Sequence, residues 1–451
     1  MKKYRLYLLP AFIGCFVLIM LLSLHYGILN MFFFGAEHAN VQGIDYFAVP
    51  KSFLNLVEQR SIYDTWGGSA YGPYATWYLA HPAFSIFVAS WFSFFSPWTS
   101  YWLFSIFSLG IMGVCGYLIS KRTPDLLNKQ FSYFLLLCAF PTYWMLYVGN
   151  MHAPLVLSIT LILTGIFELT YGTSTKKANS ILFAGLLISF FTKPIVLLML
   201  PLLLIMKETR ATTLKSIFIY GFISLAFIFV PLLNPDAVGW EKLTSIDFRY
   251  IQEHMNIYKN NFVLNAFMKD NSIHWTNLIA QSDYKLIHID VFSLPVFVDV
   301  LLGKETEAWI FKLPIYICLA LSIAIAFIAD KKIRLECTLL LIMAISLTFF
   351  LSYNTVWEYQ FTSTLPLIAF LPILKKKQVF YEKHIRTMTI TGLFFCLPSL
   401  YFLFRNSDLS NSTSFTWIHA DKIIPSFILF AIMIWQLLVV VKKYAVFKPK
   451  S

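Results

Sequence analysis

The sequence predicts an all-α polytopic membrane protein on three observations: its composition, its long apolar runs and the placement of its basic residues. Of 451 residues, 58% are hydrophobic and 13% are charged, whereas a soluble domain carries about 25% charged residues. Aromatic residues make up 18% of the chain, and such residues gather at membrane interfaces. Because no polar block is long enough for a soluble domain, we expect residues 1–451 to form a single integral membrane domain.

The basic residues form short clusters between the apolar runs, although the net charge of +12 could also indicate a nucleic-acid partner. Clusters of this kind follow the positive-inside rule and set the topology. We therefore expect no nucleic-acid partner and place the clusters on the cytoplasmic side. They are Lys2-Lys3-Arg5, Lys121-Arg122, Lys176-Lys177, Lys207-Arg210, Lys331-Lys332-Arg334, Lys375-Lys376-Lys377 and Lys442-Lys443.

The N-terminal third sets the direction of every later span. Residues 6–34 are too long an apolar run for a cleaved signal peptide, so we expect an uncleaved first helix that runs outward. Residues 35–99 then form the first outer loop. Within it, residues 71–98 are aromatic and interrupted by prolines. A span there would invert every later basic cluster, so we expect interfacial (juxtamembrane) helices instead.

The rest of the chain supplies further runs near the length of about 20 residues that a span requires. Two of them, residues 181–191 and 195–206, are short halves hinged at Lys193-Pro194, and we expect the hinge to lie below the outer surface. Residues 234–306 form a large outer loop. In total we predict about 12 transmembrane helices with both termini cytoplasmic. The other predicted spans are residues 101–120, 131–148, 153–171, 214–233, 309–329, 335–352, 361–374, 387–404 and 423–441.

Two further patterns exclude function classes. The six cysteines are scattered through apolar runs, so they are expected to be small hydrophobic residues and not a disulfide framework or a metal site. There is no GxxxxGK[ST] motif and no long cytoplasmic loop. The chain therefore has no recognisable nucleotide-binding domain.

With this topology, the unusual polar residues lie on the outer face, where each has two interpretations. Asp45 is either a base anchored at the membrane surface or a solvated loop carboxylate. Lys193 either binds an anion such as a lipid phosphate or extends toward the interface. Glu358 could bind substrate or form a structural hydrogen bond. His152 could bind substrate or cap a helix. Arg249 lies in the large outer loop, where a solvated cation is the simplest interpretation.

Three stretches, in order along the chain, resemble a known family. The first is Gly43-Ile-Asp45-Tyr-Phe with the turn Tyr71-Gly-Pro-Tyr74, and the second is Gly149-Asn150-Met-His152 with the later Lys193-Pro194. The third is Val356-Trp357-Glu358-Tyr359-Gln360. Together they resemble the GT-C class of membrane glycosyltransferases, and most closely glycosyltransferase family 87, the polyprenyl-phosphate-mannose-dependent α-mannosyltransferase type. The sequence departs from the family at Tyr74, where a second proline is common, and at Tyr359-Gln360, where histidines are common.

The resemblance implies a GT-C fold and an inverting hexosyl or pentosyl transferase that builds a cell-envelope glycan. It implies a polyprenyl-phosphate sugar donor, a glycolipid or glycan acceptor, and a site on the outer side of the inner membrane, among membrane lipids. Asp45 would be the general base. Lys193 and Arg249 would bind the donor phosphate, with no metal and no cofactor required. The implied substrate-binding residues are Tyr74, Asn150, His152, Trp357, Glu358 and Gln360.

Two other classes stay open. About twelve spans also fit a transporter or flippase of a lipid-linked sugar or other substrate, although transporters usually carry inverted repeats and polar residues near the midplane. A polysaccharide polymerase or ligase would share the lipid-linked substrate. The sequence leaves the sugar and the acceptor open.

Overall fold

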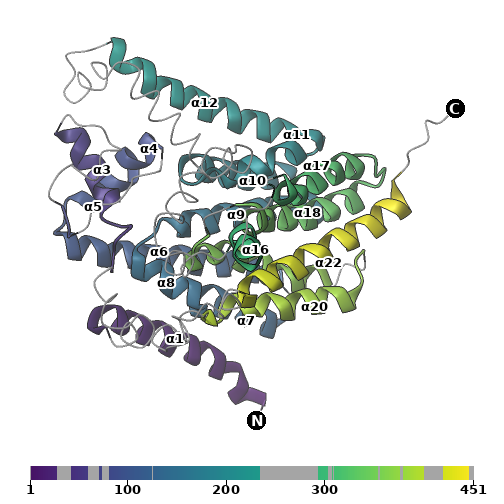
Figure 1. Cartoon of the computed structure of the whole chain (residues 1–451), viewed down its shortest axis with the longest axis horizontal. Coiled ribbons are helices and arrows are strands. Elements are labelled where there is room, and N and C mark those ends of the chain that lie inside the picture. Colours follow the sequence, from purple (N-terminus) through teal and green to yellow (C-terminus); the bar gives the residue numbers. More distant parts are fainter. Residues whose placement is uncertain are drawn as a thin grey trace.

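The protein was studied as a computed structural model, which describes residues 2–27, 42–58, 71–73, 81–123, 125–233, 293–302, 307, 309–353, 356–375, 379–400 and 420–445. Within these ranges the fold is helical (Figure 1), apart from an isolated antiparallel bridge between Ile328 and Ala445. The predicted all-α class is therefore confirmed. A buried apolar core joins residues from α1 (Lys2–Tyr26) to α22 (Ala420–Tyr444).

Among the described residues, six helical segments are long and apolar enough to cross a membrane. Each coincides with a run that the sequence predicted to span. They lie in α1, α6 (Pro97–Ser120), α7 and α8 together (Leu126–Cys138 and Phe140–Val148), α9 (His152–Tyr171), α18 (Lys331–Ser352) and α22. Together with the composition they indicate a membrane protein. Among these six described segments α18 is the most enclosed, since its apolar stretch is 100% buried. The finer count of about twelve spans stays a prediction.

The other described runs form shorter or interrupted helices. Nearest the break at Lys193 lie α10 (Thr175–Phe191), η3 (Pro194–Leu198) and α11 (Leu200–Ile205), followed by α12 (Arg210–Leu233). The later ones are α16 (Leu294–Leu302), η6 (Ile310–Lys312), α17 (Leu313–Ala326), η7 (Glu358–Thr364), α19 (Leu365–Lys375), α20 (Glu382–Gly392) and η8 (Leu393–Cys396). The predicted break is confirmed, because Lys193 is extended (φ −132°, ψ 111°) before a proline that disfavours helix.

Three predicted runs differ from the observed helices in an end or in continuity, each at a glycine or a proline. The first helix ends at Tyr26 and not at residue 34, because Gly27 takes a left-handed conformation (φ 72°) and closes the helix. The predicted span 131–148 is broken at Ala139, ahead of a proline in the first turn of α8. The predicted span 387–404 is interrupted at Leu397, which is extended before Pro398.

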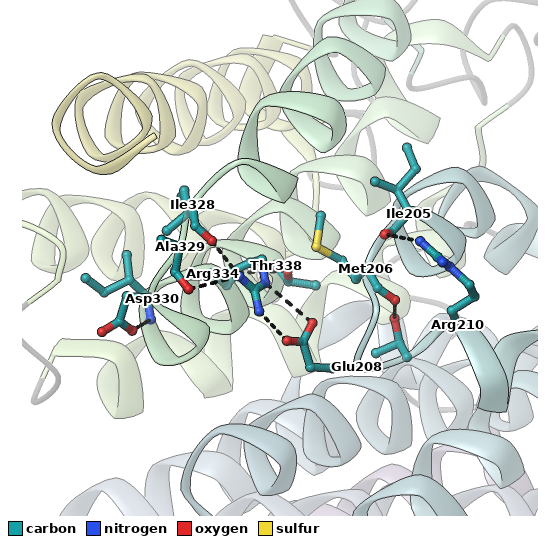
Figure 2. Close-up of polar contacts among 11 residues, drawn as sticks. Ile205, Met206, Glu208, Arg210, Ile328, Ala329, Asp330, Arg334 and Thr338 are labelled. Carbon is teal, nitrogen blue, oxygen red and sulfur yellow. Dashed lines mark hydrogen bonds and ion pairs between the residues drawn. The ribbon is translucent and has the colours of Figure 1, made fainter. Parts of the chain in front are cut away.

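Several residues of the basic clusters make polar contacts at the ends of helices. Arg122, after α6, pairs with Glu168 near the end of α9 at 2.5 Å, and Arg334 at the start of α18 pairs with Glu208 (Figure 2). Arg210 donates to the carbonyl oxygen of Ile205 at the end of α11 (3.0 Å, Figure 2). The two ion pairs join segments that the sequence analysis places on the cytoplasmic side, and that orientation stays a prediction.

Short helices lie beside the N-terminal part of α6, where Figure 1 shows α3 (Ala48–Val57), α4 (Pro82–Phe84) and α5 (Ser90–Ser93) together. With η2 (Ser85–Ala89), α4 and α5 form a helical segment of about 18 Å, shorter than the roughly 30 Å apolar core of a bilayer. This segment is too short to span by itself, and the interfacial interpretation of residues 71–98 is not tested by it. Its location in the interface stays a prediction.

Candidate functional site

The turn that carries Asp45 is fixed to the end of α8. The backbone N–H of Gly43 donates to the carbonyl oxygen of Tyr147 (2.7 Å), and that of Asp45 donates to Val148 (2.9 Å). Gly149, which ends α8, is left-handed (φ 71°). A Cβ atom at this glycine would lie 2.4 Å from Cβ of Tyr46, so both the backbone conformation and the close approach require glycine.

Aromatic packing holds the same turn from the other side. Tyr46 is fully buried, its ring packs against Tyr101 and Phe104 at centroid distances of 5.8 and 4.9 Å, and its hydroxyl contacts Ser100. The Tyr101 hydroxyl donates to the carbonyl oxygen of Leu146 (2.8 Å). These contacts fix Asp45 relative to α6 and α8.

A polar network connects Asp45 to Lys193 through Asn150. The Asn150 side-chain amide donates to Oδ2 of Asp45 (2.7 Å), and its Oδ1 accepts from Nζ of Lys193 (2.9 Å). Nζ of Lys193 also lies 2.8 Å from Nδ1 of His152. Four of the site residues predicted from sequence are therefore in one cluster, built where α8 ends, α9 begins and α10 has just ended.

Tyr359 completes the cluster and was absent from the predicted site residues. Its ring centroid lies 5.2 Å from that of His152 in an edge-on arrangement and 5.6 Å from Nζ of Lys193. Burial raises the pKa of Tyr359, and the nearby carboxylate of Asp45 raises it further. The sequence signal was its position in the third matching stretch, where the family commonly has a histidine.

Burial shifts Asp45 and Lys193, the two ends of the network, toward their neutral forms. It raises the pKa of Asp45, an effect opposed by the hydrogen bond from Asn150 and by the charge of Lys193. It lowers the pKa of Lys193 to about 7, opposed only by Asp45. Asn150 separates Lys193 from that carboxylate, so the cation has neutral hydrogen-bond acceptors. A bound anion would favour its charged form.

The third matching stretch forms a second, separate set of contacts. Glu358 Oε1 lies 3.2 Å from Nζ of Lys422, and both side chains are buried. Burial raises the pKa of Glu358 to about 7 against the opposing charge of Lys422. The backbone N–H of Trp357 donates to Oε1 of Gln360 (3.0 Å). These contacts hold η7 in place, and substrate binding by Trp357, Glu358 and Gln360 stays a prediction.

Two predicted site residues, Tyr74 and Arg249, lie outside the residues that the structure describes, as does most of the outer loop 234–306. In the described ranges, no group of three or more His, Cys, Asp or Glu side chains is placed to hold a metal ion. All six cysteines are free.

Comparison of the chain with protein-family models, curated proteins and solved structures gives no match. The function must therefore be argued from the cluster itself. Its chemistry is that of a carboxylate and a primary amine that hydrogen-bond to the same amide side chain, at the end of α9 opposite the Arg122–Glu168 ion pair.

Proposed function

We propose that the protein is a GT-C-type glycosyltransferase that moves a monosaccharide from a polyprenyl-phosphate donor to an acceptor hydroxyl on the outer face of the inner membrane. The observation that carries the proposal is the Asp45–Asn150–Lys193 network, with its hydrogen bonds of 2.7 and 2.9 Å. Asp45 and Lys193 are held on either side of Asn150. A base and a cation in this arrangement suit a reaction in which Asp45 takes a proton and Lys193 faces the departing phosphate.

The reaction follows from the two groups. Asp45 accepts the proton of the acceptor hydroxyl, whose oxygen forms a bond to the anomeric carbon. The bond between that carbon and the phosphate oxygen breaks, and the electron pair leaves with the phosphate. Lys193 stabilises the negative charge of the leaving polyprenyl phosphate, in a partly buried position where such stabilisation is strong. Attack from the face opposite the phosphate inverts the anomeric configuration.

The topology supports an outer site. Arg122 pairs with Glu168 near the end of α9, whereas His152 begins the same helix, which is 20 residues long and therefore about 30 Å. The basic residue Arg122 therefore lies at one end of α9 and the polar network at the other. This separation supports cytoplasmic basic clusters and a site at the opposite surface of the membrane. A sugar carried on a lipid suits a chain in which we recognise no nucleotide-binding motif.

The test is sugar transfer in proteoliposomes from a panel of radiolabelled polyprenyl-phosphate sugars to lipid and glycan acceptors. Wild type is compared with Asp45→Asn and with Asp125→Asn, a matched change at the N-cap of α7 that asparagine also suits. We expect transfer by wild type and Asp125→Asn, and a loss of about 10²–10⁴-fold in Asp45→Asn. Full turnover by Asp45→Asn would remove the base. Donor movement across the bilayer without transfer would favour the transporter class.

A further inference from the structure

The imidazole of His152 has one nitrogen in the polar network and one without a partner. The residue is fully buried at the first position of α9. Nδ1 lies 2.8 Å from Nζ of Lys193 and 3.0 Å from Oδ1 of Asn150. Nε2 is buried and has no hydrogen-bond partner in the part of the chain that the structure describes. Buried polar atoms are usually paired, so this one requires an explanation.

The neighbours of Nδ1 determine the tautomer of the ring. A charged lysine only donates hydrogen bonds, so Nδ1 accepts from Lys193 and the ring proton of a neutral imidazole is on Nε2. The Asn150 Oδ1 atom accepts from the same ammonium, so its 3.0 Å separation from Nδ1 is a contact between two acceptors and not a hydrogen bond. The Asn150 amide is oriented by Asp45, because a carboxylate accepts from the NH₂ group. Its oxygen therefore faces Lys193 as a second acceptor. The opposite tautomer would direct an N–H group at the ammonium.

We propose that His152 donates a hydrogen bond from Nε2 to a phosphate oxygen of the lipid-linked donor. The inference rests on the proposed function and adds a second phosphate-binding group to Lys193. A buried N–H group without an acceptor is costly, and a bound oxygen removes that cost. An anionic oxygen is the preferred acceptor because Lys193 contacts the same ring, so one phosphate would meet a charged donor and a neutral donor together.

His81 provides an internal control. It is also buried, and its Nδ1 accepts from the backbone N–H of Ala83 (3.0 Å), which places its proton on Nε2 as well. In contrast to His152, its Nε2 lies 3.0 Å from the hydroxyl of Ser224. The two histidines therefore share a tautomer and differ in whether Nε2 has a partner.

The first experiment is NMR of the full-length protein, labelled with ¹⁵N and ¹³C at histidine, in lipid nanodiscs at pH 6. The His152 and His81 signals are assigned from the spectra of His152→Gln and His81→Gln. We expect the Nε2–H tautomer at both positions. Addition of polyprenyl monophosphate should shift the His152 Nε2 resonance and leave that of His81 unchanged. An Nδ1–H tautomer at His152 in the free protein would overturn the inference whatever the function is.

The second experiment measures the affinity for polyprenyl monophosphate. Glutamine can place its amide N–H near the position of Nε2, whereas asparagine reaches only the position of Nδ1. We expect His152→Gln to bind within a few-fold of wild type and His152→Asn to bind about tenfold more weakly or worse. Equal affinities for both variants would overturn the phosphate contact. Failure of wild type itself to bind polyprenyl monophosphate would overturn the proposed donor, and the phosphate contact with it.

Discussion

Two lysines, Lys193 and Lys422, are held inside the protein in opposite ways. Lys422 is fully buried and its Nζ lies 3.2 Å from the carboxylate of Glu358, while it also donates to the carbonyl oxygens of Phe394 (2.9 Å) and Leu397 (2.5 Å). Nζ of Lys193 has the Asn150 amide oxygen, a histidine nitrogen and the ring of Tyr359 around it. The carboxylate of Asp45 favours the charged form of Lys193, and Asn150 forms hydrogen bonds to both side chains.

We interpret the difference as that between a structural cation at Lys422 and, under the proposed function, an anion-binding cation at Lys193. A buried charge with a carboxylate and carbonyl partners is compensated, so Lys422 holds η7, η8 and α22 together. The charge of a cation surrounded by neutral acceptors is compensated only in part, so such a cation can bind an anionic ligand. Substitutions at the two positions should therefore affect different properties, one the stability of the protein and the other its reaction.

The largest expected effect is on stability, at Lys422. In Lys422→Met, the carboxyl group of Glu358 stays buried without its cation, and loss of one partner of a buried pair costs about 3–5 kcal/mol. We expect a strongly lowered unfolding midpoint in detergent, measured by thermal or denaturant unfolding. The double variant Lys422→Met with Glu358→Gln should recover part of the loss, because the remaining side chain is uncharged. A single variant as stable as wild type would show that the pair is not a structural one.

The sequence anticipated the first lysine better than the second. Proline after Lys193 predicted the helix break, and counting basic residues placed Asp45, Asn150, His152 and Lys193 on one face. It could not give their contacts, because Asn150 is 105 positions from Asp45 and 43 from Lys193. Long-range pairing of this kind depends on how the helices pack.

Residues at the ends of predicted elements were the hardest to interpret. Lys422 directly precedes the predicted span 423–441 and was not among the predicted site residues, while its partner Glu358 had two interpretations, a structural hydrogen bond and, through the family resemblance, substrate binding. Tyr359 was noted only as a departure from that resemblance. In each case the contact joins η7 to another element, and no local pattern of residues encodes it.

The second effect is on the reaction, at Lys193. Lys193→Met removes the cation that stabilises the leaving phosphate, and we expect transfer to fall about 10²–10³-fold. Removal of a partly buried amine that lacks a contacting carboxylate should leave the unfolding midpoint unchanged or raise it. Sugar transfer and the thermal unfolding midpoint of the same variant are measured to check the two expectations.

Lys215→Met serves as the matched control, since Lys215 lies near the Phe183 ring (5.3 Å) and outside the network. Unchanged donor affinity in Lys193→Met would show that the lysine only extends toward the interface.

The smallest effect is the pH dependence of donor binding, and it sharpens the comparison because, of the two lysines, Lys193 is the one that we propose binds an anion. Burial lowers the pKa of Lys193 to about 7 in the free protein, and a bound phosphate raises it again. The ammonium is therefore present below pH 7 and lost above it, so affinity for polyprenyl monophosphate should be highest below pH 7. It should fall by up to about tenfold per pH unit above that value. Asp45, Tyr359 and His152 also face this site, and burial raises the pKa of Asp45 and Tyr359. Ionisation of Asp45 would also weaken phosphate binding, but at lower pH, so Asp45→Asn is measured as well.

The arginine variant is the control for this prediction. In Lys193→Arg the side chain keeps its charge through this pH range, and the decrease in affinity above pH 7 should disappear. If that decrease persists in the arginine variant, a group other than Lys193 controls donor binding.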